Sequence, residues 1–177
     1  MKRAIAVLGA AIILTSLVGC GEEPLGAGRL AESKAPAQLL RVEAVSRVPG
    51  YQVDSMATPE ERSQACDPSD PEQKERFWRS SVEIFMIDNA SVRPEAIVSD
   101  LVDSFVDQGW TATEDQREGE PVPFTLITSA TSPVAIEVQQ HPKTADAKAS
   151  ITIVTSGPCV VTDGEGSDEV LALEGGG

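Results

Sequence analysis

The segment from Ile97 to Gln108 has the clearest periodicity in this chain, and it constrains the fold more than any other stretch. Apolar residues at helical spacing fill one half of its helical wheel, and aspartates fill the other half. Pro94 stands close to its start and Gly109 follows its end, as is typical of helix boundaries. The pattern predicts an amphipathic helix that packs on a sheet. Its apolar positions are Ile97, Val98, Leu101, Val102, Phe105 and Val106.

Several other segments alternate between apolar and polar residues, which predicts the strands of that sheet. A second helix is expected over Pro36–Val48 and a short strand over Tyr51–Met56, whereas the polar, proline-interrupted stretch Thr58–Glu75 predicts a loop. We therefore expect an α+β fold in two layers, with an antiparallel sheet of about five to six strands, two helices on one face and the order αββαβββ. The alternating segments are Trp78–Ile87, Trp110–Glu114, Phe124–Ser129, Val134–Gln139 and Ala149–Ser156.

The N-terminus has the pattern of an export signal. Met1–Arg3 is basic, Ala4–Leu17 is almost entirely apolar, and Leu17-Val18-Gly19-Cys20 places small residues before a cysteine. The apolar run is short for a membrane span. This order resembles the signal peptide and lipobox of bacterial lipoproteins, which implies cleavage before Cys20 and a diacylglycerol attached to its sulfur by a thioether. A plain signal peptide followed by a chance cysteine is the alternative.

On this interpretation the chain divides into a signal peptide at residues 1–19, a flexible tether at 20–35, one α+β domain at 36–160 and a disordered acidic tail at 161–177. The tether is rich in glycine and charge and lacks an apolar period. The tail ends in three glycines and holds too few apolar residues to offset the entropy lost on ordering.

The charge of the chain narrows the set of partners. With 14 basic and 28 acidic residues the net charge is −14, and loss of Lys2 and Arg3 with the signal brings it to −16. Such a surface repels nucleic acid and anionic lipid headgroups, so we expect neither as a direct partner. The expected partners are the lipid bilayer, through acylated Cys20, and an unknown protein or small-molecule ligand. No motif indicates a cofactor.

Cys66 and Cys159 remain once Cys20 is assigned to lipid. An even pair of cysteines in an exported protein predicts a disulfide, which would tie the loop before the first long strand to the end of the last strand. A reactive thiol and a metal ligand are the alternatives. Two distant cysteines and a single histidine fall short of a zinc site.

The sequence predicts no catalytic residue and no metal ligand. His141 is the only histidine, and we expect it to be exposed in a turn. The motifs Gly-x-Ser-x-Gly and His-Glu-x-x-His are both absent from the sequence. Asp67, Asp70 and Glu72 form an acidic cluster, but the prolines between them prevent the ligand spacing of a calcium loop, so a solvated loop is expected.

Trp78 is the one residue that we select as a candidate for ligand binding. It follows Cys66 and the acidic loop, so its ring would line a surface next to them. A core position is the alternative for Trp78. For Trp110, between a helix end and a strand start, we expect a structural role.

From residue 36 to 160 the chain resembles small secreted lipoproteins of the actinobacterial type. The resemblance rests on Pro49-Gly50-Tyr51 after a helix, the cysteine-bearing loop at Cys66, Gly109-Trp110 after the amphipathic helix, and Gly157-Pro158-Cys159 after the last strand. It implies an α+β two-layer fold and a cell-surface address, and it implies no activity.

These observations together predict a lipoprotein anchored on the extracytoplasmic side of the cell membrane. We expect a non-catalytic binding or accessory module of the cell envelope. One alternative is a structural or stress-related surface lipoprotein without a specific ligand. An extracytoplasmic hydrolase is a further alternative with less support.

Overall fold

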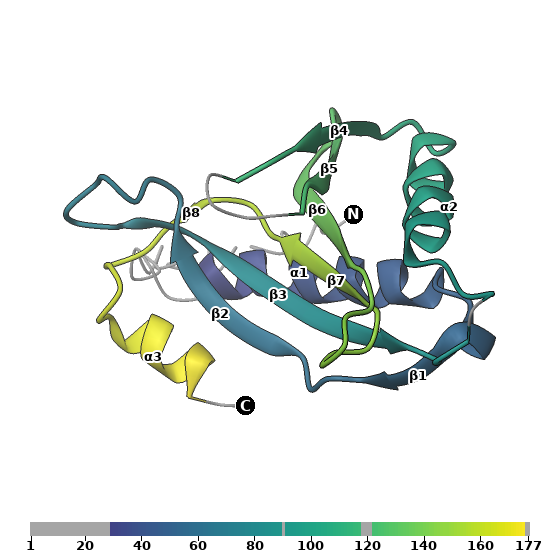
Figure 1. Ribbon diagram of the computed structural model, residues 1–177. Coiled ribbons are helices and arrows are strands. Elements are labelled where there is room, and N and C mark those ends of the chain that lie inside the picture. The colour runs from purple at the N-terminus through teal and green to yellow at the C-terminus, as the bar shows by residue number, and fades with distance from the viewer. Residues whose placement is uncertain (1–28, 90, 118–121, 176–177) are drawn as a thin grey trace, which may run out of the picture.

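An antiparallel sheet with helices on one face forms the frame of the computed structural model, which describes residues 29–89, 91–117 and 122–175 (Figure 1). Its helices are α1 (Arg29–Ser46), α2 (Pro94–Val106) and α3 (Asp168–Glu174), with a short 3-10 turn at Gly50–Gln52. Its strands are β1 (Val53–Met56), β2 (Glu60–Ala65), β3 (Glu75–Met86), β4 (Thr111–Asp115), β5 (Phe124–Ser129), β6 (Ser132–His141), β7 (Ser150–Ser156) and β8 (Val160–Val161).

Strand β3 organises the sheet, because it pairs with four other strands. The main order is β1-β3-β7-β6-β5-β4, with β2 and β8 also paired to β3. Along one edge of β3, β1 pairs near its C-terminal end and β2 pairs with its N-terminal half. Along the other edge, β7 is followed by the two-residue β8. The expected α+β fold with an antiparallel sheet is confirmed, while eight strands and a third helix match the expected count and layering only roughly.

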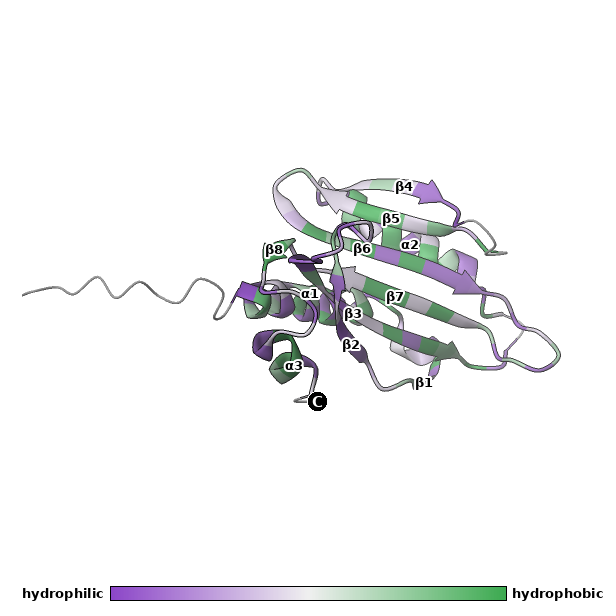
Figure 2. Ribbon diagram, turned by 90° about the vertical axis from the view of Figure 1, so that its left-hand side faces the viewer, coloured by the Kyte–Doolittle hydropathy of each residue, from purple (hydrophilic) through white to green (hydrophobic). Residues whose placement is uncertain are grey.

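The main core lies between the sheet and the two longer helices, which cover the same face (Figures 1 and 2). Alternate residues of β3 point toward the helices, and the cross-strand register continues this apolar face through β7, β6 and β5. None of the described helices covers the opposite face, which carries mainly polar side chains. The fully buried members of the core include Ile84, Ile127, Ile136, Ile151, Ile153, Leu101 and Phe105.

Helix α2 matches the periodic segment of the sequence and ends as expected at Gly109. Gly109 has a φ of +87°, and its N–H donates to the carbonyl of Val106 at 2.8 Å. This left-handed conformation suits glycine and turns the chain into β4. The Trp110 ring meets Phe105 edge-on at 5.4 Å, so Trp110 has the structural role that we expected. Arg47 at the end of α1 stacks on the other side of this contact, 3.7 Å from the Phe105 ring centre.

Strand β2 lies inside the stretch for which we predicted a loop, so that prediction is wrong for Glu60–Ala65. It is polar on both faces, which hides its period from a search for alternating apolar residues. The side chain of Glu61, on the helix face, accepts hydrogen bonds from Trp78 Nε1 and from Ser80 Oγ, and it pairs with Arg41. These bonds satisfy the carboxylate where an apolar residue would be expected.

Helix α1 begins at Arg29 instead of Pro36, so the predicted tether is wrong for residues 29–35. Pro36 lies inside the helix, although a proline, which lacks an N–H, is typical of a first helical turn. Leu30 is fully buried, and its N–H donates to Glu169 Oε1 at 2.6 Å. The start of α1 is therefore satisfied by a residue 139 positions away. Residues 20–28 lie outside the described part of the chain.

The segment after residue 161 is also ordered through residue 175, so the prediction of a disordered tail is wrong there. Ser167 begins α3, and its side chain accepts the N–H of Val170. Val170 is fully buried in a second apolar cluster with Leu30, Ala37 and Trp78. Leu173 also packs against this cluster, so two apolar residues dock the helix on a surface that α1 and β3 supply.

Helix α1 touches the sheet most closely where β7 gives way to β8. The N–H of Trp78 donates to Ser33 Oγ at 2.8 Å, and the N–H of Gly157 donates to the carbonyl of Trp78 at 2.9 Å. A Cβ at Gly157 would lie 2.0 Å from the carbonyl oxygen of Ser33, which no packing adjustment of side chains relieves. Only glycine at position 157 permits this approach of helix to strand.

The variant Gly157→Ala is expected to lower the free energy of unfolding by about 1–3 kcal/mol or more, because its Cβ must push α1 off the sheet. Gly50→Ala is the matched control, since a Cβ at Gly50 meets nothing within 4 Å. The control should change stability by no more than about 0.5 kcal/mol. Urea denaturation of both variants measures the difference, and equal stability would contradict the close packing at Gly157.

Candidate functional site

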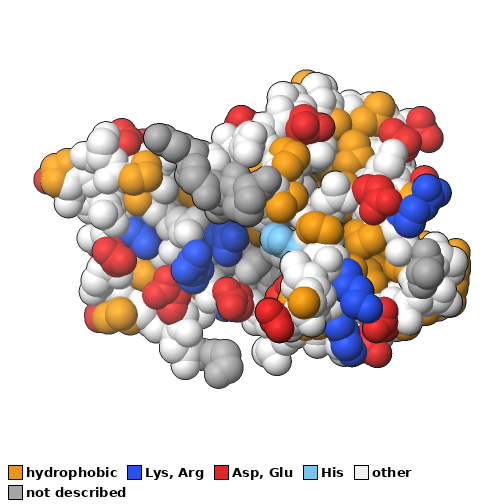
Figure 3. Space-filling view, in the orientation of Figure 1, with side chains coloured by type: hydrophobic (Ala, Val, Ile, Leu, Met, Phe, Trp, Pro, Cys, Tyr) orange, Lys and Arg blue, Asp and Glu red, His pale blue; other side chains and the backbone are white. Residues whose placement is uncertain are grey.

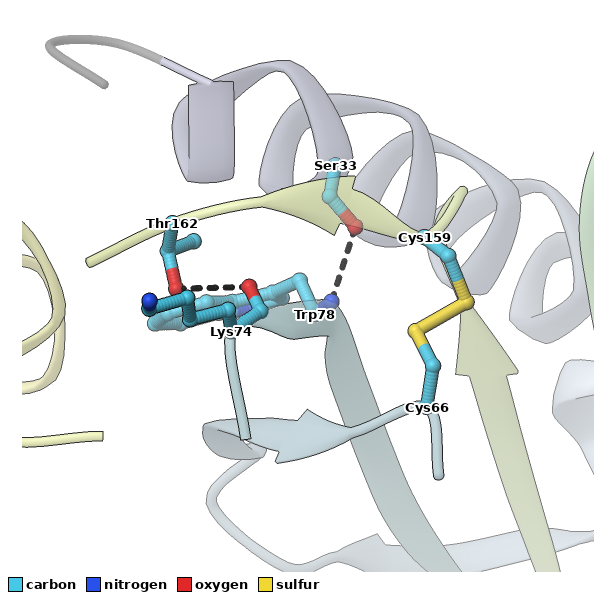
Figure 4. The surroundings of a disulfide bond; sticks show 6 residues. All are labelled: Ser33, Cys66, Lys74, Trp78, Cys159 and Thr162. Carbon is cyan, nitrogen blue, oxygen red and sulfur yellow. Dashed lines mark hydrogen bonds between the residues drawn. A yellow bond between two sulfur atoms is a disulfide. The ribbon is translucent and has the colours of Figure 1, made fainter. Parts of the chain in front are cut away.

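Cys66 and Cys159 form a disulfide, as the sequence predicts, with 6.2 Å between their Cα atoms (Figure 4). Cys66 directly follows β2, and Cys159 lies between β7 and β8. The bond spans 93 positions of sequence and links the strands on the two edges of β3. It fixes the loop of residues 66–74 next to the end of the sheet.

Trp78 is a core residue, which corrects our expectation that its ring lines a surface. Its side chain has no exposed surface, and it lies in the second apolar cluster. Lys34 Nζ lies 4.2 Å from the ring centre, and the indole N–H donates to Glu61. The alternation along β3 places Trp78 on the sheet face that α1 covers, where its ring packs with Leu30 and Ala37.

The other residues singled out in the sequence make local contacts. His141 is half-buried, with Nε2 3.1 Å from Thr152 Oγ1. The hydroxyl and N–H of Ser69 both donate to Asp67 Oδ1, which lowers the pKa of the Asp67 carboxyl. Among the described residues, no group of three or more histidine, cysteine, aspartate or glutamate side chains is placed to hold a metal ion. Cys20 lies outside the described residues.

Three arginines that the sequence did not single out lie on the paired strands β2 and β3: Arg76 on the sheet face that carries Trp78, and Arg62 and Arg79 on the opposite face. Six other cations, Arg41, Arg47, Lys74, Arg117, Lys143 and Lys148, form ion pairs. No carboxylate oxygen of the described chain lies within 4 Å of these three arginines. Arg76 differs from the other cations without an ion pair among the described residues in being buried.

Arg76 is the buried one of these three arginines, with only 2% of its surface exposed. Its Nε and Nη2 donate to Ser63 Oγ at 3.1 and 2.9 Å, and Nη1 donates to Gln73 Oε1 at 3.3 Å. Gln73 has a φ of 45°, an uncommon conformation for a residue with a side chain. A guanidinium has five N–H donors, so Arg76 keeps donors that these neutral partners do not use.

Ser63 connects Arg76 to the last helix. Its N–H and its hydroxyl donate to Glu174 Oε1 at 2.9 and 2.8 Å, while the same hydroxyl oxygen accepts from Arg76. Arg76 and Glu174 are thus joined through one hydroxyl group without direct contact. The carboxylate also occupies a backbone N–H of β2 that faces away from β3.

A cavity of about 530 Å³ opens beside this chain of contacts, between β2, the loop of residues 66–74 and the C-terminal segment. Its volume lies within the usual range for small-ligand sites. Arg62 and Arg76 line it, and so do the acids Glu165 and Glu174. The remaining lining residues are Ser63, Gln64, Ala65, Pro68 and Gln73.

Arg62 also faces Arg79 directly across the β2–β3 pair, on the sheet face that no described helix covers. Burial lowers the pKa of Arg79, and the nearby charge of Arg62 lowers it further. Arginine nonetheless stays protonated in proteins, so two cations stand side by side at a cost to stability. Basic side chains gather over this part of the molecule in Figure 3, between acidic ones.

The sequence held a partial signal for Arg76. Arg76 precedes Trp78 by two residues, so both lie on one face of a strand once β3 is extended to Glu75. The burial of Arg76 could not be predicted from the sequence, because it depends on how β2, the 66–74 loop and α3 come together around it.

Comparison of the chain with protein-family models, with curated proteins and with solved structures found no match. Within the described residues, no helix is long and apolar enough to cross a membrane. The site therefore has to be interpreted from its own geometry.

Replacing both cysteines, as in Cys66→Ser with Cys159→Ser, is expected to lower the free energy of unfolding by about 2–5 kcal/mol. The bond closes a long loop and so restricts the unfolded chain. Denaturant titration of the wild-type protein with and without a reductant should show the same loss, and the double variant should not respond to the reductant. A wild-type protein that releases two thiols on denaturation alone would contradict the bond.

Proposed function

We propose that this protein is a lipoprotein anchored on the extracytoplasmic side of the cell membrane, where it acts as a non-catalytic module that binds an anionic group. The lipobox-like Leu17–Cys20 sequence supports the anchor, and the Cys66–Cys159 disulfide fits an oxidising compartment. Because α1 begins at Arg29, only residues 21–28 separate the lipidated Cys20 from the domain. Even fully extended, that segment spans no more than about 30 Å.

The buried guanidinium of Arg76 is the observation that carries the binding proposal. Removing a charge from water is costly unless it is paired, and here the partners among the described residues are a hydroxyl and an amide. An anion in the adjacent cavity would supply charge-assisted hydrogen bonds to the donors that remain. Arg62 on the cavity wall adds a second positive charge, and Glu165 on the same wall opposes it.

A structural or stress-related surface lipoprotein without a ligand is the alternative role. This role is favoured if the arginines serve only to hold β2, β3 and α3 together. The two roles differ in one measurable property, the response of the protein to added anions.

The anchor is tested by Cys20→Ala. Without the sulfur no diacylglycerol can be attached, so we expect the variant to remain uncleaved or to be released in soluble form. Cell fractionation and the mass of the mature N-terminus report the outcome. A variant that is processed and sedimented with membranes like the wild type would show that Cys20 is not the lipid attachment site.

Anion binding is tested on the full-length protein purified in a nonionic detergent. Succinate and inorganic phosphate, each compared with chloride at equal ionic strength, are expected to raise the melting temperature in a saturable way. Arg76→Met and Arg62→Gln should remove or weaken the effect. Arg93→Gln is the matched control, because Arg93 is exposed at the start of α2, on an element that does not line the cavity.

Because Arg76→Met also removes a buried hydrogen-bonding group, circular dichroism must first show that this variant is folded. If Arg76→Met is not folded, the exposed Arg62→Gln variant provides the test. An equal response of the wild type to chloride, succinate and phosphate would favour the role without a ligand.

A further inference from the structure

The cavity at β2 already holds one carboxylate, that of Glu174 at the end of α3. We propose that the anion bound at this site is itself a carboxylate, and that it takes the position of Glu174, so that the last turn of α3 is a built-in competitor. This inference rests on the proposed anion binding at Arg76, and it adds the chemical class of the ligand and a means of regulating access.

The contacts of Glu174 define the chemistry of the position. A backbone N–H and a hydroxyl of Ser63 converge on Oε1, and the Arg76 guanidinium lies directly behind the hydroxyl. Glu174 Oε2 has no hydrogen-bond partner within the described residues. Glu174 thus satisfies the Ser63 donors with one oxygen and does not contact Arg76.

A free carboxylate in the cavity can do more than Glu174 does. It can place one oxygen on Ser63 and the other on an unused N–H group of Arg76, in a charge-assisted hydrogen bond. Glu174 is tethered to a helix and lacks this second contact. The advantage of the free ligand is therefore a direct charge-assisted bond to a buried cation.

Displacement of Glu174 requires only the end of α3 to open. Val170, one turn earlier, is fully buried, and Glu169 accepts the N–H of Leu30, so the first turn is held independently of Glu174. Glu174 is the last residue of the helix, where the Gly175 N–H donates to the Leu171 carbonyl and Lys34 Nζ donates to the Leu173 carbonyl. Helix ends fray at low cost, and this end is followed by glycine.

The test compares Glu174→Ala with Glu165→Ala in the full-length protein in nonionic detergent. Both variants remove one negative charge from the same cavity, but only Glu174 occupies the Ser63 donors. Calorimetry with succinate is expected to show an affinity about tenfold higher for Glu174→Ala than for the wild type, and a smaller gain for Glu165→Ala. Inorganic phosphate should bind more weakly than succinate to each protein.

Hydrogen exchange of the Gly175 amide provides a second readout in the wild type. Saturating succinate is expected to accelerate this exchange, because the ligand frees the last turn, while the amide of Val170 keeps its protection. A merely electrostatic effect of the ligand would leave the exchange of Gly175 unchanged.

Equal gains for the two glutamate variants, with unchanged exchange at Gly175, would overturn the competition while leaving anion binding in place. Tighter binding of phosphate than of succinate would overturn the choice of a carboxylate. Absence of binding in every variant would instead overturn the proposed function on which this inference rests.

Discussion

The contact between Ser33 of α1 and the backbone of β3 is the interaction on which the rest of the structure depends. Strand β7 pairs with β3 as far as Arg79, and β8 resumes pairing at Arg76, so the ladder is interrupted at Trp78. The Trp78 carbonyl is satisfied by the Gly157 N–H, and its N–H is satisfied by Ser33 Oγ. A helix side chain thus replaces a missing strand bond, which fixes the depth and position of α1 on the sheet. It also explains why Gly157, which leaves room for Ser33, stands at the end of β7.

The C-terminal segment depends on that arrangement in turn. Because α1 lies so close to β3, Leu30 and Ala37 reach Trp78 and form a small apolar cluster, which Val170 completes and against which Leu173 packs. A helix of seven residues is too short to be stable alone. Its stability comes from this cluster, from Glu169 on the Leu30 N–H and from Glu174 on Ser63. The two ends of the domain therefore stabilise each other, because α3 and the first turn of α1 each depend on contacts with the other.

These dependencies explain which parts of the fold were predictable. Strand β5 was expected at its observed bounds, Phe124–Ser129, because alternation in a half-buried strand is a local signal. The Cys66–Cys159 bond could be predicted from the even number of remaining cysteines and the expected oxidising compartment. In contrast, β2 was missed because Glu61 is satisfied by distant partners, and α3 was missed because its anchor lies in α1. Trp78 was misplaced and Arg76 overlooked for the same reason: burial of a large or charged side chain is decided by which elements meet around it.

The position of the arginines follows from the same convergence. In an acidic protein, the cations that find carboxylates are mostly at the surface, where ion pairs contribute little to stability. Arg76 is instead enclosed by β2, the disulfide-held loop and α3, which screen it from water without offering it a carboxylate in direct contact. Such an arrangement lowers the stability of the folded chain, and natural selection tolerates this cost most readily where the charge has a use. The disulfide holds the loop next to the guanidinium, so the enclosure of Arg76 does not depend on α3 alone.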